Sequence, residues 1–91
     1  MTIRKFIPNQ LRRLRRVRGL KQKEVANILG LKNTSMISRW EAGQCLPETV
    51  NLFRLAIIYR TSPEGLFHDL VRGLRAKLIK REKNVSEQTD K

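Results

Sequence analysis

The 91-residue chain has little of the chemistry on which most enzymes and metalloproteins depend, with one cysteine, Cys45, and one histidine, His68. A single cysteine cannot close an internal disulfide, and one cysteine with one histidine does not make a metal-ligand cluster. No nucleophile–base pair, carboxylate dyad or phosphate-binding glycine loop is present. The sequence therefore predicts a protein that is not an enzyme and that has no cofactor, metal or small-molecule ligand.

Long apolar runs are also missing. No stretch approaches the eighteen or more apolar residues needed to span a bilayer, so no membrane-spanning helix is expected. Basic Arg4 and Lys5 are followed by polar Asn9 and Gln10 rather than by the apolar region of a signal peptide. We therefore expect a cytoplasmic protein, in a reducing environment that suits a lone cysteine.

Acidic residues are scarce, with eight Asp and Glu against twenty Lys and Arg and a formal net charge of +12. The excess is uneven: the local balance is +10 over residues 1–39, −2 over 40–71 and +4 over 72–91. Five of the seven residues at positions 12–18 are arginine. Such a field favours a polyanionic partner, with nucleic acid the first candidate and an anionic membrane the second.

The residue pattern is helical throughout, and no β-strand signal of useful strength is found. Five helices are expected, at about residues 9–18, 21–29, 34–42, 48–59 and 63–83. Apolar spacing predicts the inward positions of three of these helices: Leu11, Leu14 and Val17; Ile37 and Trp40; and Leu52, Phe53, Leu55, Ala56 and Tyr59. The apolar members of the helix at 21–29 are Val25, Ala26, Ile28 and Leu29. A chain of this length can bury one modest core.

Residues 22–41 carry the most informative pattern, two short helices joined by a turn. Ala26 is small where the two helices would cross, and Gly30 supplies the positive φ that ends the first of them. Ile37 and Trp40, three residues apart, would hold the second helix on the core, which makes Trp40 a core residue rather than a base-stacking one. This arrangement is a helix-turn-helix.

Several motifs in fixed order extend this pattern over Leu11–Phe67: Leu11-Arg-Arg-Leu-Arg, Leu20-Lys-Gln-Lys-Glu-Val-Ala, Ile37-Ser-Arg-Trp-Glu-Ala-Gly, and Pro47 followed by Leu52, Leu55 and Ala56. This segment resembles the phage-repressor and Cro-like (XRE-type) helix-turn-helix family. The resemblance implies an all-α, compact five-helix repressor-like domain that binds DNA and regulates transcription. It also implies a structural pair of Arg15 with Glu41, and a Gln22 that holds a phosphate and braces the recognition helix.

Four residues are candidates to contact DNA bases from a recognition helix at about Thr34–Ala42. Short or planar polar groups at the exposed start of such a helix can reach base edges in the major groove, and these are Thr34, Ser35, Ser38 and Arg39. Phosphate contacts are expected from Lys21, Gln22, Lys23, Asn33 and Gln44. The structural residues are Arg15, Ala26, Gly30, Ile37, Trp40 and Glu41.

The turn departs from the resembled family. Ala26 and Ile37 are eleven residues apart, one more than is commonest there, and the extra residue is expected in the turn at 31–33. Either Asn33 or Thr34 can then cap the recognition helix, and either Thr34 or Ser35 can point deepest into the groove. Lys21 stands where the family often has a capping Ser or Thr.

Helical periodicity continues past the resembled segment through Leu70, Val71, Leu74 and Leu78. We divide the chain into a basic arm (1–8), a repressor-like domain (9–68), a basic C-terminal helical extension (69–83) and a disordered tail (84–91). The apolar stripe of the extension either wraps back as a cap on the first and fourth helices or forms the seam of a homodimer.

The sequence favours a sequence-specific regulator of double-stranded DNA, which the resemblance places in a bacterium or phage, associated with the nucleoid. One alternative is an antitoxin-type regulator whose C-terminal helix binds a toxin, and another is a non-specific basic protein associated with RNA or DNA. The stacking aromatics or glycine-rich clamp of an RNA reader are absent. The operator, the regulated gene and the sign of regulation are not encoded in any readable pattern.

Overall fold

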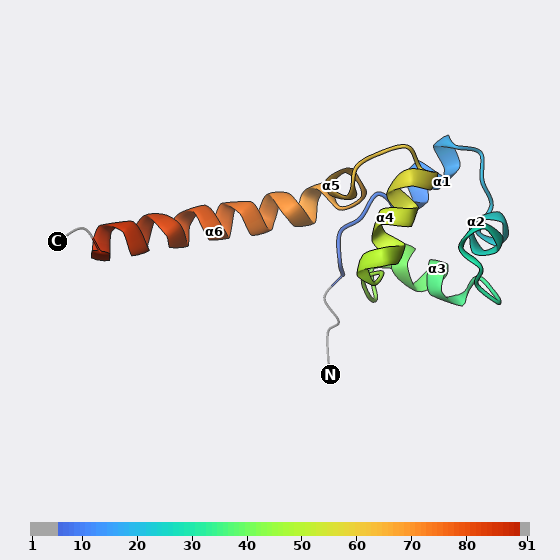
Figure 1. Ribbon diagram of the computed structural model, residues 1–91, viewed down its shortest axis with the longest axis horizontal. Helices are drawn as coiled ribbons and strands as arrows, with labels where there is room; N and C mark the ends of the chain where they lie inside the picture. The colour runs from blue at the N-terminus through green and yellow to red at the C-terminus, as the bar shows by residue number, and fades with distance from the viewer. Residues whose placement is uncertain (1–5, 90–91) are drawn as a thin grey trace.

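The computed structural model describes residues 6–89, and within them the chain forms six helices and no strand (Figure 1). They are α1 (Leu11–Val17), α2 (Gln22–Leu29), α3 (Ser35–Glu41), α4 (Thr49–Ile58), α5 (Pro63–Leu66) and α6 (His68–Thr89). The predicted all-α class is confirmed. The first five residues of the predicted basic arm and the last two of the predicted tail lie outside the described residues.

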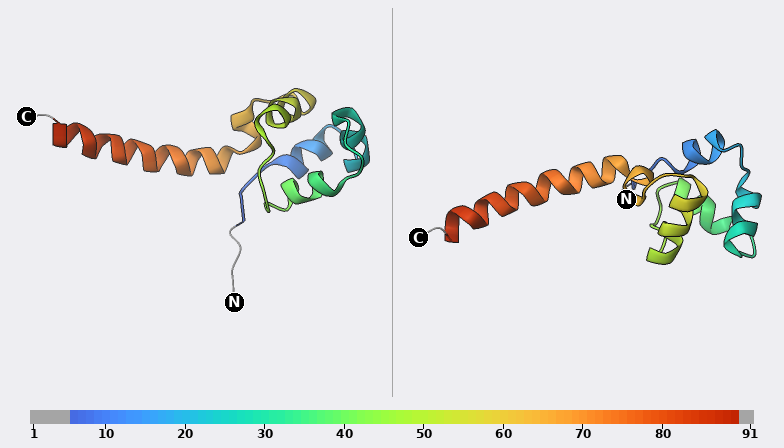
Figure 2. Two further views of the ribbon diagram at one scale, coloured as in Figure 1. Left: turned by 60° about the horizontal axis from the view of Figure 1, so that its bottom comes forward. Right: turned by 45° about the horizontal axis from the view of Figure 1, so that its top comes forward.

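Helices α1 to α5 enclose one hydrophobic core, and α6 leaves it as a single projecting rod (Figures 1 and 2). The core side chains come from every helix of the domain and from the residues that flank α4 and α5: Leu11, Val25, Ala26, Ile37, Trp40, Leu55, Ala56, Tyr59, Leu66 and Phe67. Burying a side chain of Leu or Phe size stabilises the fold by about 1.5–3 kcal/mol. This core fixes where α2 and α3 lie.

Two glycines set the boundaries of the helix pair. Gly30 has φ +76° and ends α2, as predicted, and residues 30–34 connect α2 to α3. Gly43, with φ +71°, follows α3, and its carbonyl accepts a hydrogen bond of 2.9 Å from the Ile7 N–H. A Cβ there would lie 2.5 Å from the Phe6 ring and 2.8 Å from the Ile7 carbonyl oxygen. The N-terminal segment can therefore pass beside the end of α3 only because residue 43 is glycine.

The helix caps partly follow the sequence prediction. Ser62 accepts a hydrogen bond of 3.0 Å from the Gly65 N–H, as expected of a cap before Pro63. At α3 the N-cap position is Thr34, but Asn33 Oδ1 accepts the hydrogen bond from the Ser35 N–H, at 2.9 Å. Both alternatives for that cap thus contribute, one as backbone and one as side chain.

Two predicted core residues are wrong, since Val17 is 71% and Phe53 53% exposed. Of the apolar members of α2, Val25 and Ala26 are buried and Ile28 is 60% exposed. Val17 is the last residue of α1 and lies beyond its packed turns. Helix α4 is apolar on nearly every face, so periodicity could not tell its inner side, which carries Leu55 and Ala56, from its outer side, which carries Phe53.

The predicted single helix at 63–83 is two helices. The chain leaves helical geometry at Phe67 (φ −131°, ψ 44°), which places the Phe67 ring in the core. The Leu66 carbonyl accepts a hydrogen bond of 2.8 Å from the Gln10 N–H instead of continuing a helical ladder. Contact with the N-terminal segment therefore breaks the helix and sets the direction of α6.

Helix α6 does not wrap back over α1 and α4, which was one of the two expectations for it. Leu70 and Val71 pack against the core, whereas Leu74 is 50% and Leu78 55% exposed. The helix also extends to Thr89, so residues 84–89 are helical where a disordered tail was predicted. Their polar composition misled the prediction because helical hydrogen bonds close within the segment and require no buried face.

The one tyrosine of the chain, Tyr59, gives a test of this core. Burial raises its pKa to about 12, assisted by Glu41 and opposed by Arg15. We expect its phenol absorbance to titrate near pH 12 in the folded protein and near pH 10 in urea. The stability conferred by the neutral phenol is present below pH 10 and is lost as the pH rises toward 12. Titration near pH 10 in the folded state would contradict this packing.

Candidate nucleic-acid interface

Helix α3 has a buried side and a polar outer side. Ile37 and Trp40 are 1% and 3% exposed, which confirms that Trp40 packs in the core and does not offer its ring to a base. Ser35, Ser38 and Arg39 are exposed. The sequence folds this way because residues 37 and 40 are the apolar pair at helical spacing, which leaves the polar positions to solvent.

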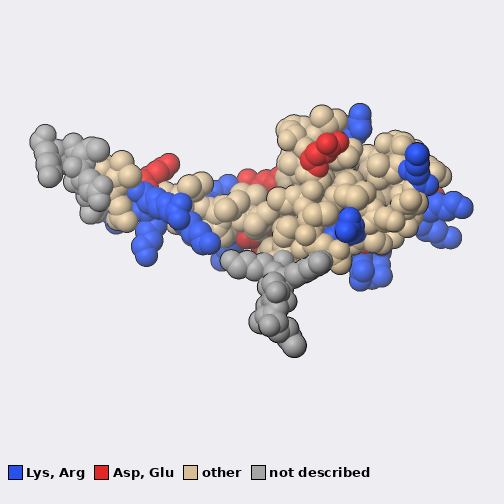
Figure 3. All heavy atoms as spheres, turned by 90° about the horizontal axis from the view of Figure 1, so that it is seen from below, with Lys and Arg blue, Asp and Glu red and all other residues tan. Residues whose placement is uncertain are grey.

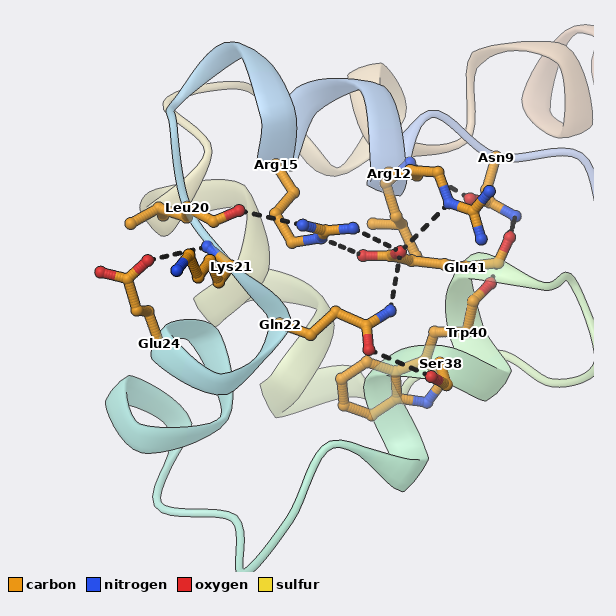
Figure 4. A network of polar contacts seen from close by, with 11 residues as sticks. Asn9, Arg12, Arg15, Leu20, Lys21, Gln22, Glu24, Ser38, Trp40 and Glu41 are labelled. Atoms are coloured by element: carbon orange, nitrogen blue, oxygen red, sulfur yellow. Dashed lines mark hydrogen bonds and ion pairs between the residues drawn. The ribbon is translucent and has the colours of Figure 1, made fainter.

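The carboxylate of Glu41 ends α3 and ties it to α1 (Figure 4). Arg15 donates two hydrogen bonds to it, from Nε to Oε2 at 2.6 Å and from Nη2 to Oε1 at 3.1 Å, and Arg15 Nη1 donates to the Leu20 carbonyl at 2.9 Å. The Glu41 side chain is 0% exposed and that of Arg15 12%. A paired fork of this kind fixes the angle between two helices as well as their distance.

Gln22 extends this network from α2 to the middle of α3. Its Nε2 donates to Glu41 Oε1 at 3.1 Å, and its Oε1 accepts a hydrogen bond of 3.1 Å from Ser38 Oγ (Figure 4). One carboxamide thus links Glu41 at the end of α3 to Ser38 on its outer face. The geometry fits a brace for α3, and the second hydrogen on Nε2 is left for a phosphate.

Two further side chains reach the end of α3 from the N-terminal part of the chain. Asn9 Nδ2 donates to the Trp40 carbonyl at 3.2 Å and lies 3.4 Å from that of Glu41. Arg12 Nε lies 3.6 Å from Glu41 Oε1. The sequence analysis placed neither Asn9 nor Arg12 beside α3, because contacts between residues 29 to 32 positions apart leave no local signal.

These contacts set the ionisation of the pair. Burial alone would raise the pKa of Glu41, but hydrogen bonds from Arg15 and Gln22 and the charges of Arg15 and Arg12 outweigh it, so its pKa lies below the ordinary 4.5. The hydrogen bond to Glu41 likewise raises the pKa of Arg15. Both groups are therefore charged at neutral pH, and α3 is held by a full ion pair.

The structure brings part of the predicted phosphate set together. Lys23 and Asn33 of that set line one hollow of 300 Å³ between α2 and the turn before α3, together with Thr34, a predicted base contact. Lys21 is exposed at the start of α2, where the Glu24 carboxylate accepts a hydrogen bond of 2.8 Å from the Lys21 N–H. Glu24 thus supplies the capping contact that Lys21 itself cannot make.

Gln44 is exposed in the loop after α3, apart from that hollow. Its backbone N–H donates to the Arg39 carbonyl at 3.0 Å, which leaves its side chain as the group free to bind a ligand.

Met36 is an outer-face residue that sequence reasoning missed. It is 37% exposed in the first turn of α3, beside Ser35. An apolar side chain at such a position can contact the methyl group of thymine. Its place one residue before buried Ile37 was the available signal, but only polar residues were considered as base contacts.

The basic side chains form two groups. Figure 3 shows Lys and Arg at the end of the domain away from α6 and again along α6, and most of the acidic groups visible in this view lie between them. Among residues 6–89, no cluster of three or more His, Cys, Asp or Glu could hold a metal ion. Within the same part of the chain, no helix has the length and apolarity to cross a membrane.

A family model described as "Helix-turn-helix domain" matches residues 9–77, which include all of α1 to α5 and the first half of α6. No curated protein and no solved structure matches the chain.

Proposed function

The chain belongs to the helix-turn-helix domain family, and from that premise we propose that it is a sequence-specific regulator of transcription, repressor-like, that binds double-stranded DNA with α3 in the major groove. The observation that carries the proposal is the exposed polar face of α3 on a braced helix, in a protein of net charge +12. Major-groove readers place such a face against base edges.

The contacts divide into two classes. Ser35, Ser38 and Arg39 stand on the outer face of α3 and are assigned to bases, with Thr34 at the N-cap beside them. Lys21, Gln22, Lys23, Asn33 and Gln44 are assigned to phosphates, which position the protein without reading sequence.

The hydrogen bond from Ser38 to Gln22 also determines whether Ser38 donates to a base or accepts from one. The Ser38 hydroxyl proton is committed to Gln22 Oε1, so Ser38 Oγ offers lone pairs to DNA. The groups it can accept from in the major groove are the amino groups of adenine and cytosine.

A repressor-like domain that reads one half-site generally acts as a symmetric pair. The exposed stripe on α6 is the surface assigned to this pairing, through Leu70, Val71, Leu74 and Leu78. We assign the protein to the cytoplasm, where its DNA would be.

Selection of bound duplexes from a random pool, at physiological salt with heparin as competitor, tests the proposal. We expect a pseudopalindrome with half-sites about 10 base pairs apart. The Ser38→Ala protein is the matched variant, since it removes one hydroxyl from an exposed position, and it should relax the preference at one base in each half-site. A wild-type pool that stays random while binding remains sensitive to salt would mark a non-specific coating protein and overturn the proposal.

A further inference from the structure

An apolar groove opens where α6 leaves the domain. It has a volume of 270 Å³, and its walls come from the loop after α3, from α4, from α5 and from the start of α6. The lining includes Leu46, Leu52, Phe67, Leu70 and Val71, with the carboxylate-bearing Glu64 at its rim. Leu46 is 52% exposed and Glu64 52% exposed by side chain, so the groove is open to solvent on that side.

The groove is continuous with the apolar stripe of α6. Leu70, which lines it, is followed at four-residue intervals by Leu74 and Leu78, so the three side chains share one helix face. Leu74 and Leu78 are half exposed, and Arg81 follows one turn later on nearly the same face. The molecule therefore presents a groove and an apolar ridge side by side.

Charge decides how two copies of this surface would pair. Residues 63–71 hold Glu64 and Asp69 and no lysine or arginine, whereas residues 72–83 hold six basic side chains and one acidic one. Parallel pairing of α6 would set the six cations beside six more, within a screening length of about 8 Å. Antiparallel pairing lays the basic part of each helix over the acidic start of the other.

Resting on the dimer of the proposed function, we infer that two copies pair through antiparallel α6 helices, with Leu78 of each seated in the groove of the other. A two-fold axis at Leu74 sets Leu78 opposite the partner's Leu70 and Arg81 opposite the partner's Phe67, beside the partner's Glu64. The groove of each molecule thus receives the apolar ridge of its partner. The recognition helices are left uncovered at the two ends.

Sedimentation equilibrium of the full chain without DNA tests this pairing. We expect a monomer–dimer equilibrium in which Leu78→Asp raises the dissociation constant by about tenfold or more, because a carboxylate enters an apolar groove. The matched control is Ile57→Asp, the same kind of change at a residue that is 76% exposed on α4, and it should leave the constant unchanged. Both sites are exposed, so circular dichroism should show both variants folded.

A charge swap tests the orientation. Glu64 pairs with Arg75 of its own chain at 3.1 Å, but both side chains are more than half exposed, so the carboxylate can also reach the partner's Arg81. Glu64→Lys and Arg81→Glu should each weaken the dimer, and the double variant should restore part of the loss, since these two side chains lie close only in the antiparallel register. A monomeric wild type, an unchanged Leu78→Asp, a dimer broken by Ile57→Asp, or a double variant without rescue would each overturn the inference.

The same variants separate this inference from the DNA-reading proposal. A monomeric Leu78→Asp protein should still prefer the same half-site over random duplex, at reduced affinity. If the wild type dimerised as described but showed no sequence preference, the DNA-reading proposal would be wrong and the dimer inference would stand.

Discussion

Replacing Glu41 by alanine is expected to lower the free energy of unfolding by about 3 kcal/mol, because it leaves the Arg15 guanidinium without its partner in a place where water cannot fully replace it. The Glu41 side chain is wholly buried, whereas Arg15 is 12% exposed, so some water can reach the guanidinium. The loss should therefore lie near the lower end of the range of about 3–5 kcal/mol for removing one partner of a buried ion pair. Urea unfolding followed by the fluorescence of Trp40, the one tryptophan of the chain, measures it.

The matched control is Glu64→Ala. Glu64 pairs with Arg75 at 3.1 Å, and both side chains are more than half exposed, so its removal should cost less than about 1 kcal/mol. Equal losses for the two variants would show that the Arg15–Glu41 pair is no more than a surface contact. Glu41→Gln keeps an oxygen acceptor for Arg15 and should fall between the two, and no loss of stability or DNA affinity in that variant would rule out the clamp.

The effect should depend on pH. The pKa of Glu41 is lowered in the folded protein, so the stability it confers is present above its ordinary value of 4.5 and is lost as the pH falls through the folded pKa. The gap in stability between wild type and Glu41→Ala should therefore be widest near neutral pH and close in acid. A gap that stayed constant down to pH 3 would mean that the charge of Glu41 is not what binds α3 to α1.

DNA affinity is expected to fall about 150-fold between 50 and 200 mM salt. The two cationic phosphate contacts of each protomer, Lys21 and Lys23, would give a dimer about four, and a logarithmic slope of about −3.6. Fluorescence anisotropy of a labelled operator over that range gives the slope. An affinity that changed less than about tenfold would contradict phosphate binding by this face.

Two variants, one in α2 and one in α3, should distinguish a phosphate contact from a base contact. Lys23→Ala should reduce the slope and weaken specific and non-specific binding alike, while Arg39→Ala should cost about 1–3 kcal/mol for each half-site and relax the preference there. Lys80→Ala removes the same charge from α6 and is the control. If Arg39→Ala weakened operator and random duplex equally, Arg39 would be a phosphate contact.

Much of the candidate site could be predicted from local sequence because its signals are local. Gly30 ends α2 through its positive φ, and Ile37 with Trp40 defines the buried side of α3 through their spacing. The pairing of Arg15 with Glu41 was inferred from family resemblance rather than from spacing, since the two residues are 26 positions apart. The base and phosphate assignments remain predictions.

The sequence by itself determined that the chain is all helical, that it is strongly basic, and that residues 22–41 form a helix, a turn and a helix with a polar outer face. Each of these depends on interactions within one or two helical turns, which residue type and spacing specify. Only the tertiary structure decided the break at Phe67, the outward direction of α6, the exposed face of α4, and the link from Glu41 through Gln22 to Ser38. These features depend on which surfaces pack against each other across the core. An apolar pattern indicates that one face of a helix is buried, but it does not identify the element that buries it.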